Sequence, residues 1–461
     1  MNKLISISKI ALIAITLFST VSCNDDDDNG NIIDNNGNNT IADYVRGNEN
    51  YSSLLAALEK TGLDATLAGS GSFTVFAPDN AAFDLFLNGT ALADVDDAAL
   101  TQILLNHVLN VERLSTDLVT GYVKNLATEE STGVNIDMYI DTTAGVTING
   151  QATVVAADID TDNGVIHAVD QVIALPTIVT FATTNPNLSN LVDALTAGGS
   201  TTFTDLLSDT TQDFTVFAPI NDAFTAFTNP DGNDINQVLS NHVIVGSVAV
   251  STALTNSYVT TAAIFNEESD APLSLYINTD SGVRLNGTSN VALADIVASN
   301  GVIHVVDTVI DLPKVTTFAT ADPTFSTLVA ALTADPSFGY VAALQTANGT
   351  SPAPFTVFAP TNDAFAALLT DLGATELGDI PVPTLAATLE LHVVANANVR
   401  AEDLTGIDGA SVTTLGGGQI IIDATTPAII DPDGGSNEII LTNVQAANGV
   451  IHALNRVIRD L

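Results

Sequence analysis

The chain has 461 residues, and its 53 Asp and Glu residues against 11 Lys and Arg residues give a formal net charge of −42 at pH 7. The few basic residues are scattered, so binding to a nucleic-acid backbone is excluded on electrostatic grounds. Tryptophan is absent and aromatic residues make up 5%, which disfavours a stacking platform for sugars or bases. The length corresponds to about three domains.

The chain begins with a predicted export signal. An apolar stretch at 10–21 follows two lysines and is too short to span a bilayer, which needs about 20 apolar residues. Residues 1–22 are therefore predicted to be a secretory signal. The letters FSTVSC resemble the lipobox of bacterial lipoproteins, which implies that Cys23, the single cysteine, carries lipid and anchors the chain to a membrane. An ordinary signal cleaved at a small residue is the alternative.

Residues 23–39 are rich in Asn, Asp and Gly and have almost no apolar side chain to bury. This composition predicts a disordered tether. Four aspartates directly after Cys23 and Asn24 resemble the acidic signals that send some lipoproteins to the outer face of a Gram-negative outer membrane. The expected location is thus the outer membrane, with the chain exposed at the cell surface. An orientation towards the periplasm is the alternative.

The hexapeptide FTVFAP occurs three times, starting at residues 73, 214 and 355. A stripe of apolar residues with helical spacing precedes each copy, as in Tyr51, Leu54, Leu55 and Leu58. The proline that ends each copy is followed by Asn or Asp residues, which favour the start of a second helix. Each hexapeptide is therefore predicted to be a short buried strand that leads into a helix.

The second half of each repeat is predicted to be rich in β-strands. Residues 134–140 alternate between apolar and polar, which is typical of a half-buried strand. The pentapeptide NGVIH then recurs at 163, 300 and 448, where Asn-Gly favours a turn and Val-Ile-His begins a last strand. Prolines after these strands set the predicted domains at 40–176, 177–313 and 314–461.

These motifs resemble the two conserved boxes of fasciclin domains. The first box is similar to FTVFAPDNAAF, FTVFAPINDAF and FTVFAPTNDAF. The second is similar to ADIDTDNGVIHAVDQVIALP, ADIVASNGVIHVVDTVIDLP and VQAANGVIHALNRVIRDL. The resemblance covers everything beyond the tether. It implies an α+β fold of three tandem fasciclin domains, each a β-wedge of about seven strands with a helical layer.

The resemblance also implies a function, because the family acts mostly in extracellular adhesion through homotypic contacts, receptors or matrix partners. An Asp-Ile pair before the second box is implicated in receptor binding in animal members. It aligns with Asp158-Ile159 and Asp295-Ile296, whereas the third repeat departs from it. These four residues are candidate partner-binding residues, and an ordinary strand end before the Asn-Gly turn is the alternative.

All six histidines recur at two positions of the repeat: His107, His242 and His392, then His167, His304 and His452. The first set matches the His of a Tyr-His pair in the family, with Tyr replaced by Asn106, Asn241 and Leu391. Paired histidines can bind zinc, but no Cys, Glu or His lies at ligand spacing beside them. We therefore interpret all six as buried neutral rings that hydrogen-bond the backbone, and expect no metal site.

Other chemistry finds little support in the sequence. Asp158, Asp160 and Asp162 have the spacing of a calcium loop, but Asn163 stands where such a loop needs Gly, which favours a solvated turn. The DPDGG stretch that starts at Asp431 also favours a turn. No nucleophile motif, phosphate loop or dinucleotide fingerprint is present. We expect neither an enzyme nor a cofactor.

The leading functional hypothesis is a lipid-anchored cell-surface protein that mediates adhesion or binds an extracellular protein or matrix partner. Three similar modules suit multivalent binding, in which weak linked sites reach high avidity. The alternative is a surface lipoprotein that binds a polysaccharide or another solute for a nutrient-uptake system. Such a protein needs a concave pocket with aromatic faces.

Overall fold

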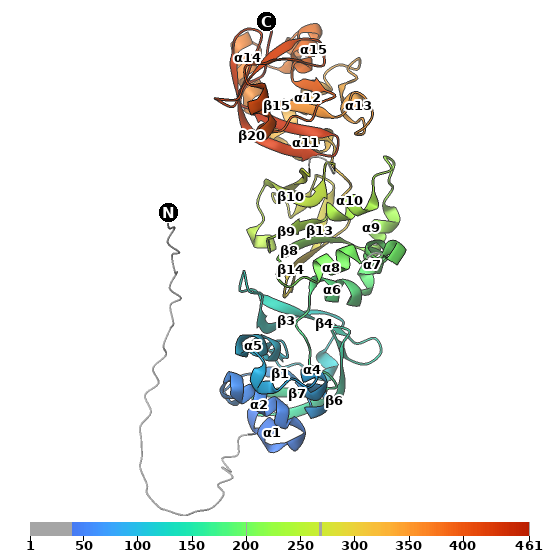
Figure 1. Cartoon of the computed structure of the whole chain (residues 1–461), viewed down its shortest axis with the longest axis vertical. Coiled ribbons are helices and arrows are strands. Elements are labelled where there is room, and N and C mark those ends of the chain that lie inside the picture. The colour runs from blue at the N-terminus through green and yellow to red at the C-terminus, as the bar shows by residue number, and fades with distance from the viewer. Residues whose placement is uncertain (1–38, 200, 267–269, 461) are drawn as a thin grey trace, which may run out of the picture. The chain divides into compact units, whose positions relative to one another are not determined.

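The computed structural model describes residues 39–199, 201–266 and 270–460, and within them it contains three seven-stranded sheets, one in each repeat. Figure 1 shows each sheet with its own set of helices. The predicted signal, Cys23 and the tether up to residue 38 lie outside the described residues. Among the described residues, no helix is long and apolar enough to cross a membrane.

Domain 1 places its strands in the order β2-β1-β7-β6-β5-β4-β3. Its α-helices are α1 (Ile41–Gly47), α2 (Ser52–Thr61), α3 (Asp64–Ala68), α4 (Asn80–Leu87) and α5 (Asp97–Leu105). Its strands are β1 (Phe73–Pro78), β2 (Val108–Leu109), β3 (Gly121–Thr128), β4 (Asn135–Asp141), β5 (Thr147–Ile148), β6 (Ala152–Thr161) and β7 (Gly164–Val169).

Domain 2 repeats this order with β10-β11-β12-β13-β14-β8-β9. Its α-helices are α6 (Ile178–Thr184), α7 (Ser189–Leu195), α8 (Thr202–Leu207), α9 (Asn221–Ala226) and α10 (Ile235–Ser240). Its strands are β8 (Phe214–Pro219), β9 (Val243–Val245), β10 (Ser257–Ile264), β11 (Pro272–Asn278), β12 (Arg284–Leu285), β13 (Ser289–Ala298) and β14 (Gly301–Val306).

Domain 3 has the same strand order, β16-β15-β21-β20-β19-β18-β17. Its α-helices are α11 (Val315–Ala321), α12 (Ser326–Leu332), α13 (Tyr340–Leu344), α14 (Asn362–Leu372), α15 (Val382–Glu390) and α16 (Ala401–Leu404). Its strands are β15 (Phe355–Pro360), β16 (Val393–Ala395), β17 (Ser411–Thr413), β18 (Gln419–Asp423), β19 (Ala428–Ile430), β20 (Ser436–Ala446) and β21 (Gly449–Leu454). The α+β architecture predicted from the sequence is thereby confirmed.

The two recurrent motifs lie side by side as the second and third strands from one edge of each sheet. The FTVFAP strand β1 pairs in parallel with the NGVIH strand β7, with Phe73 opposite Gly164 and Phe76 opposite His167. The same register recurs between β8 and β14 and between β15 and β21. Every residue of the hexapeptide is buried in all three domains, because both faces of this strand are covered.

Each FTVFAP strand separates two apolar cores. In domain 1, Val75 and Ala77 pack against the helical layer, together with Leu54 of the predicted stripe. Phe76 points to the other face and packs with Met138 and other residues of the strands. The alternation of side chains along one strand therefore joins a helix-covered core to a core between the strands.

The Asn of NGVIH has a role that goes beyond the predicted turn. The Asn163 side-chain oxygen accepts a hydrogen bond from the Ile41 backbone N–H at 2.9 Å. Its amide donates to the carbonyl oxygens of Leu67 and Gly69 at 2.8 and 2.7 Å. Asn300 and Asn448 make the equivalent three bonds. One side chain thus ties the first helix of a domain to its last strand.

Candidate functional site

The first set of histidines bridges a helix to the end of the domain. His107 Nδ1 lies 2.7 Å from the Ile103 carbonyl oxygen, one helical turn earlier, and its Nε2 accepts from the Ile173 N–H at 2.8 Å. These partners require a neutral ring with the proton on Nδ1. Burial lowers the pKa of His107 to about 4, against the opposing effect of the hydrogen bond to Ile103. His242 and His392 repeat this geometry and this pKa.

The second set of histidines lies on the NGVIH strands, and each ring contacts the second Phe of the neighbouring FTVFAP strand. His304 and Phe217 are stacked with ring centroids 5.5 Å apart, and His304 Nε2 lies 2.9 Å from the Ala249 carbonyl oxygen. Its Nδ1 accepts from the Asp295 N–H at 3.4 Å. In domain 3 the corresponding atom, His452 Nδ1, is buried without a hydrogen-bond partner. Among the described residues, no group of three or more His, Cys, Asp or Glu is placed to hold a metal ion.

The candidate partner-binding aspartates lie within a bulge of β6 and of β13. Asp158 and Asp295 both have left-handed backbone geometry, with φ of 60° and 64°. The Asp158 carboxylate accepts from the Ser115 backbone N–H at 2.7 Å and from its hydroxyl at 2.5 Å, and these bonds lower the pKa of Asp158. Asp295 makes the same two bonds with Ser251.

The two isoleucines differ in exposure, since Ile159 is half-buried and Ile296 is buried in the core of domain 2. The predicted solvated turn at 158–162 is wrong in its extent. Asp158 and Asp160 belong to β6, because residues 159 to 161 still pair with β7 beyond the bulge, and only Asp162 lies in the turn.

A polar and aromatic contact connects domains 1 and 2, and we call it the first joint. Asp137 is the centre of its polar part, with Oδ2 2.6 Å from Lys124 Nζ and accepting from the Val297 N–H at 2.7 Å. Burial raises the pKa of Asp137, against the opposing effect of Lys124. Lys124 also donates to the Asp295 carbonyl oxygen at 3.1 Å. The backbone of one candidate partner-binding residue therefore takes part in the joint.

The aromatic part of the first joint holds three rings. Tyr122 and Tyr139 of domain 1 lie 4.9 Å apart between ring centroids, and Phe181 of domain 2 meets Tyr122 edge-on at 5.3 Å. The Asn185 amide donates to the Tyr122 hydroxyl at 3.1 Å. Such a desolvated aromatic cluster stabilises the contact through both apolar burial and specific geometry.

The second joint, between domains 2 and 3, repeats the aromatic cluster with different polar groups. Tyr258 lies 4.8 Å from Tyr276 and 5.5 Å from Phe318 between ring centroids, and its hydroxyl donates to Asp322 at 2.9 Å. The Gln445 N–H donates to the hydroxyl of Ser274, which takes the place of Asp137. At this position the second joint thus has a hydroxyl where the first has a carboxylate paired with Lys124.

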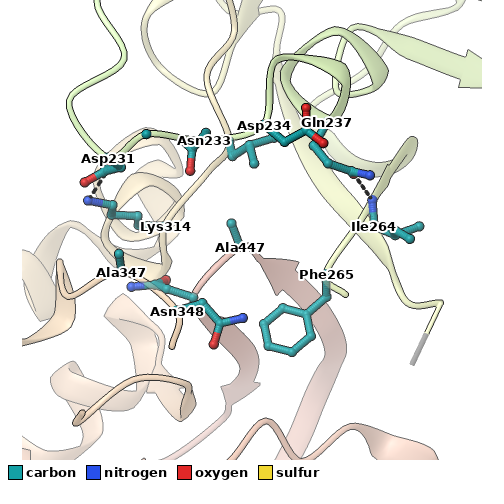
Figure 2. Close-up of a pocket in the computed structure, with 13 residues that line it drawn as sticks. Asp231, Asn233, Asp234, Gln237, Ile264, Phe265, Lys314, Ala347, Asn348 and Ala447 are labelled. Carbon is teal, nitrogen blue, oxygen red and sulfur yellow. Dashed lines mark hydrogen bonds and ion pairs between the residues drawn. The ribbon is translucent and has the colours of Figure 1, made fainter. Parts of the chain in front are cut away.

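Beside the second joint lies a pocket of about 320 Å³, drawn in Figure 2. At one side Lys314 Nζ forms an ion pair with Asp231 at 2.8 Å, and the Phe265 ring lies at the other side. Gln237 accepts from the Ile264 N–H at 2.9 Å. The pocket is lined by Asp231, Gly232, Asn233, Asp234, Gln237, Ile264, Phe265, Leu312, Lys314, Ala347, Asn348, Ala447 and Asn448.

This pocket combines one aromatic face with several amide and carboxylate groups. Its single cation is paired with Asp231, and Asp234 adds a second carboxylate. The lining therefore disfavours an anion and offers hydrogen-bond donors and acceptors to a neutral polar ligand. Sequence reasoning missed this pocket, because its residues come from two domains and are far apart along the chain.

The model of the fasciclin domain matches the chain three times, at residues 49–176, 186–313 and 323–460. The chain belongs to the fasciclin-domain family. The matched ranges begin after the helices α1, α6 and α11, so the predicted boundaries at 40, 177 and 314 stay predictions.

Similar proteins occur in animals and cyanobacteria. Human periostin is 24% identical over 431 residues, which cover 91% of this chain and 47% of periostin. Protein sll1483 of Synechocystis is 39% identical over 140 residues, covering 30% of this chain and 74% of that protein. The chain therefore spans about half the length of periostin. A solved fasciclin domain pair of the insect cell adhesion molecule Fasciclin I is 19% identical, with a TM-score of 0.33, over 55% of this chain and 92% of that one.

Proposed function

We propose that this chain is a lipid-anchored cell-surface protein that mediates adhesion or binds an extracellular protein or matrix partner through its fasciclin domains. The observation that carries the proposal is the threefold fasciclin match from residue 49 to residue 460. Adhesion is the role that membership of this family implies. The lipobox-like sequence at Cys23 supports attachment to the outer membrane with exposure at the cell surface.

The recurrent polar residues favour binding over catalysis. The rings of His107 and its equivalents use both nitrogen atoms in backbone contacts. The carboxylates of Asp158 and Asp295 accept hydrogen bonds from serines of their own domains. Groups held in this way support the fold and have little freedom to move a proton to or from a substrate.

Attachment can be tested separately from adhesion. The Cys23→Ala variant is expected to lose lipid labelling and to move from the membrane fraction to the soluble fraction, while the parent stays with the membrane. Protease treatment of intact cells is expected to remove the domains if they face outwards. Membrane attachment of the variant equal to that of the parent would contradict the lipid anchor.

Adhesion is tested by adsorption of the soluble chain, residues 24–461, to cells of its source and to matrix proteins. Linked domains are expected to bind at least tenfold more tightly than an equimolar mixture of the three separate domains, because binding of one domain concentrates the others at the surface. Equal adsorption of the linked and separated domains would contradict multivalent adhesion.

The four candidate residues Asp158, Ile159, Asp295 and Ile296 stay a proposed partner-binding set. The Asp158→Ala variant is compared with Ser115→Ala, which removes the hydroxyl bond to Asp158 but keeps the backbone bond and the carboxylate. We expect both to lose about 1 kcal/mol of stability. A loss of adsorption confined to Asp158→Ala would support direct binding, and equal losses would assign the residue to the fold.

The pocket of Figure 2 favours a second candidate function, the binding of a polysaccharide or another neutral solute. Phe265 offers a flat apolar face, and the surrounding amides can bond hydroxyl groups. A panel of neutral glycans is expected to include one that binds the parent at least tenfold more tightly than the Phe265→Ala variant. The Leu85→Ala variant, which changes an exposed apolar residue of domain 1, is the control. If no glycan binds the parent, this candidate is wrong.

A further inference from the structure

Domains 1 and 3 each have one surface whose equivalent in a neighbouring domain is buried in a joint. At both joints, the β3–β4 or β10–β11 pair of one domain is covered by the first helix of the next domain, α6 or α11. The equivalent strands of domain 3 are β17 and β18, and the equivalent helix of domain 1 is α1. These two surfaces, which we call the tail face and the head face, have no partner within the described chain.

The tail face keeps the backbone of a joint but loses its tyrosines. Ser411 pairs with Ile421 at the position where Tyr122 pairs with Tyr139 and Tyr258 with Tyr276. Tyr139 and Tyr276, the residues equivalent to Ile421, are 5% and 4% exposed, whereas Ile421 is 42% exposed. The strand position that the next domain covers in domains 1 and 2 is therefore open to a partner in domain 3.

The head face gains the groups that the tail face lacks. Tyr44 of α1 stands where α6 and α11 carry Phe181 and Phe318, which are fully buried, and it is only half-buried itself. Its hydroxyl accepts from the Asn48 amide at 3.4 Å, as the Tyr122 hydroxyl accepts from Asn185. At the internal joints the tyrosine hydroxyl comes from a strand, as in Tyr122 and Tyr258. On the head face it comes from a helix, as in Tyr44.

A second pair of changes also fits together. At the first joint, the turn after β5 lies so close to α6 that a β-carbon at Gly150 would be 2.6 Å from the Thr184 side chain. In domain 3 this turn is two residues longer, spanning 431–435 in place of 149–151. The residue equivalent to Thr184 in α1 is Gly47, and a β-carbon there would meet nothing within 4 Å. The larger turn of the tail face thus corresponds to a smaller residue on the head face.

We propose that the head face of one copy docks on the tail face of a second copy, in the geometry of the internal joints. The inference rests on the proposed adhesive function and deepens it by naming a second copy of this chain as a partner. Because the two faces differ, the contact is heterologous, and an assembly of any length keeps one free head face at one end and one free tail face at the other. The net charge of −42 opposes association, so we expect tighter association as salt is raised to about 0.5 M, where repulsion is screened within a few ångströms.

Sedimentation velocity of residues 24–461 over a range of concentrations tests the contact with three matched variants. Gly47→Glu is expected to block the head face, because a β-carbon at Gly47 meets nothing within 4 Å inside the domain, and Ile421→Glu is expected to block the tail face. Leu85→Glu places the same charge on an apolar side chain that is 72% exposed and belongs to neither face. We expect the first two variants to raise the dissociation constant at least tenfold and the third to leave it within twofold of the parent. Circular dichroism checks that each variant is folded.

A mixture of the two blocked variants gives the decisive result. Gly47→Glu retains a tail face and Ile421→Glu retains a head face, so the mixture is expected to form dimers that grow no further. A parent that stays monomeric throughout, or a mixture that does not associate although the parent does, would overturn the proposal. Adsorption to matrix proteins by the same variants separates the outcomes, because that activity would survive loss of the copy-to-copy contact.

Discussion

At the scale of single residues, the histidines carry a predictable pH dependence. Burial holds the pKa of His107, His242 and His392 at about 4, below the ordinary value of 6.5. The unfolded chain therefore takes up these protons at higher pH than the folded chain does. Stability is complete above about pH 6.5 and is lost as the pH falls towards 4, by about 3 kcal/mol per histidine.

Nitrogen-15 NMR can measure this directly. We expect the three rings to stay neutral from pH 8 to pH 5, with the proton on Nδ1. A ring that titrates near pH 6.5 in the folded protein would contradict the buried bridge between the helix and the end of its domain. Urea unfolding at pH 7 and pH 5 measures the accompanying loss of stability.

The second phenylalanine of each hexapeptide lies in the core between the strands. Phe217 is fully buried and stacks on His304. The Phe217→Ala variant is expected to lose about 3 to 5 kcal/mol, because it removes a large apolar side chain and leaves a cavity. Differential scanning calorimetry measures the loss, with Leu85→Ala as the exposed control. A melting profile equal to that of the parent would contradict the role of the motif in the core.

At the scale of secondary-structure elements, the two motifs pair because a glycine lets their backbones meet. A β-carbon at Gly301 would lie 2.2 Å from the Phe214 carbonyl oxygen. The Gly301→Ala variant should therefore displace β14 from β8 and cost about 3 kcal/mol or more. The Gly339→Ala variant, which meets nothing within 4 Å, is the matched control. Equal stability of the two variants in urea unfolding would contradict the close approach.

The sequence located most elements of each repeat but few of their partners. Helical spacing identified α2, and alternation identified β4, because both patterns follow from the local geometry of the chain. The parallel pairing of β1 with β7 joins residues about 90 positions apart, and no local pattern specifies it. The three hydrogen bonds of Asn163 could not be read from the sequence for the same reason.

At the scale of the whole molecule, the first joint depends on a buried carboxylate. Replacing Asp137 by Ala leaves the Val297 N–H without its acceptor and is expected to cost about 2 kcal/mol. Asp137→Asn keeps an acceptor oxygen and should lose less than half as much, since the exposed end of the Lys124 ion pair contributes little. Calorimetry of the chain measures both, and equal losses would show that the ion pair matters more than the bond to Val297.

The sequence by itself determined the fasciclin family, the threefold repeat and the burial of FTVFAP and NGVIH, because these depend on residue patterns that recur within the chain. Only the tertiary structure decided what the aromatic residues between the motifs do. Tyr122 and Tyr258 look like ordinary strand residues until the next domain supplies Phe181 and Phe318 against them. The joints, the pocket beside the second joint and the two end faces arise from contacts between distant residues. The joint aromatics recur at the repeat spacing, but no local pattern in the sequence shows that they meet.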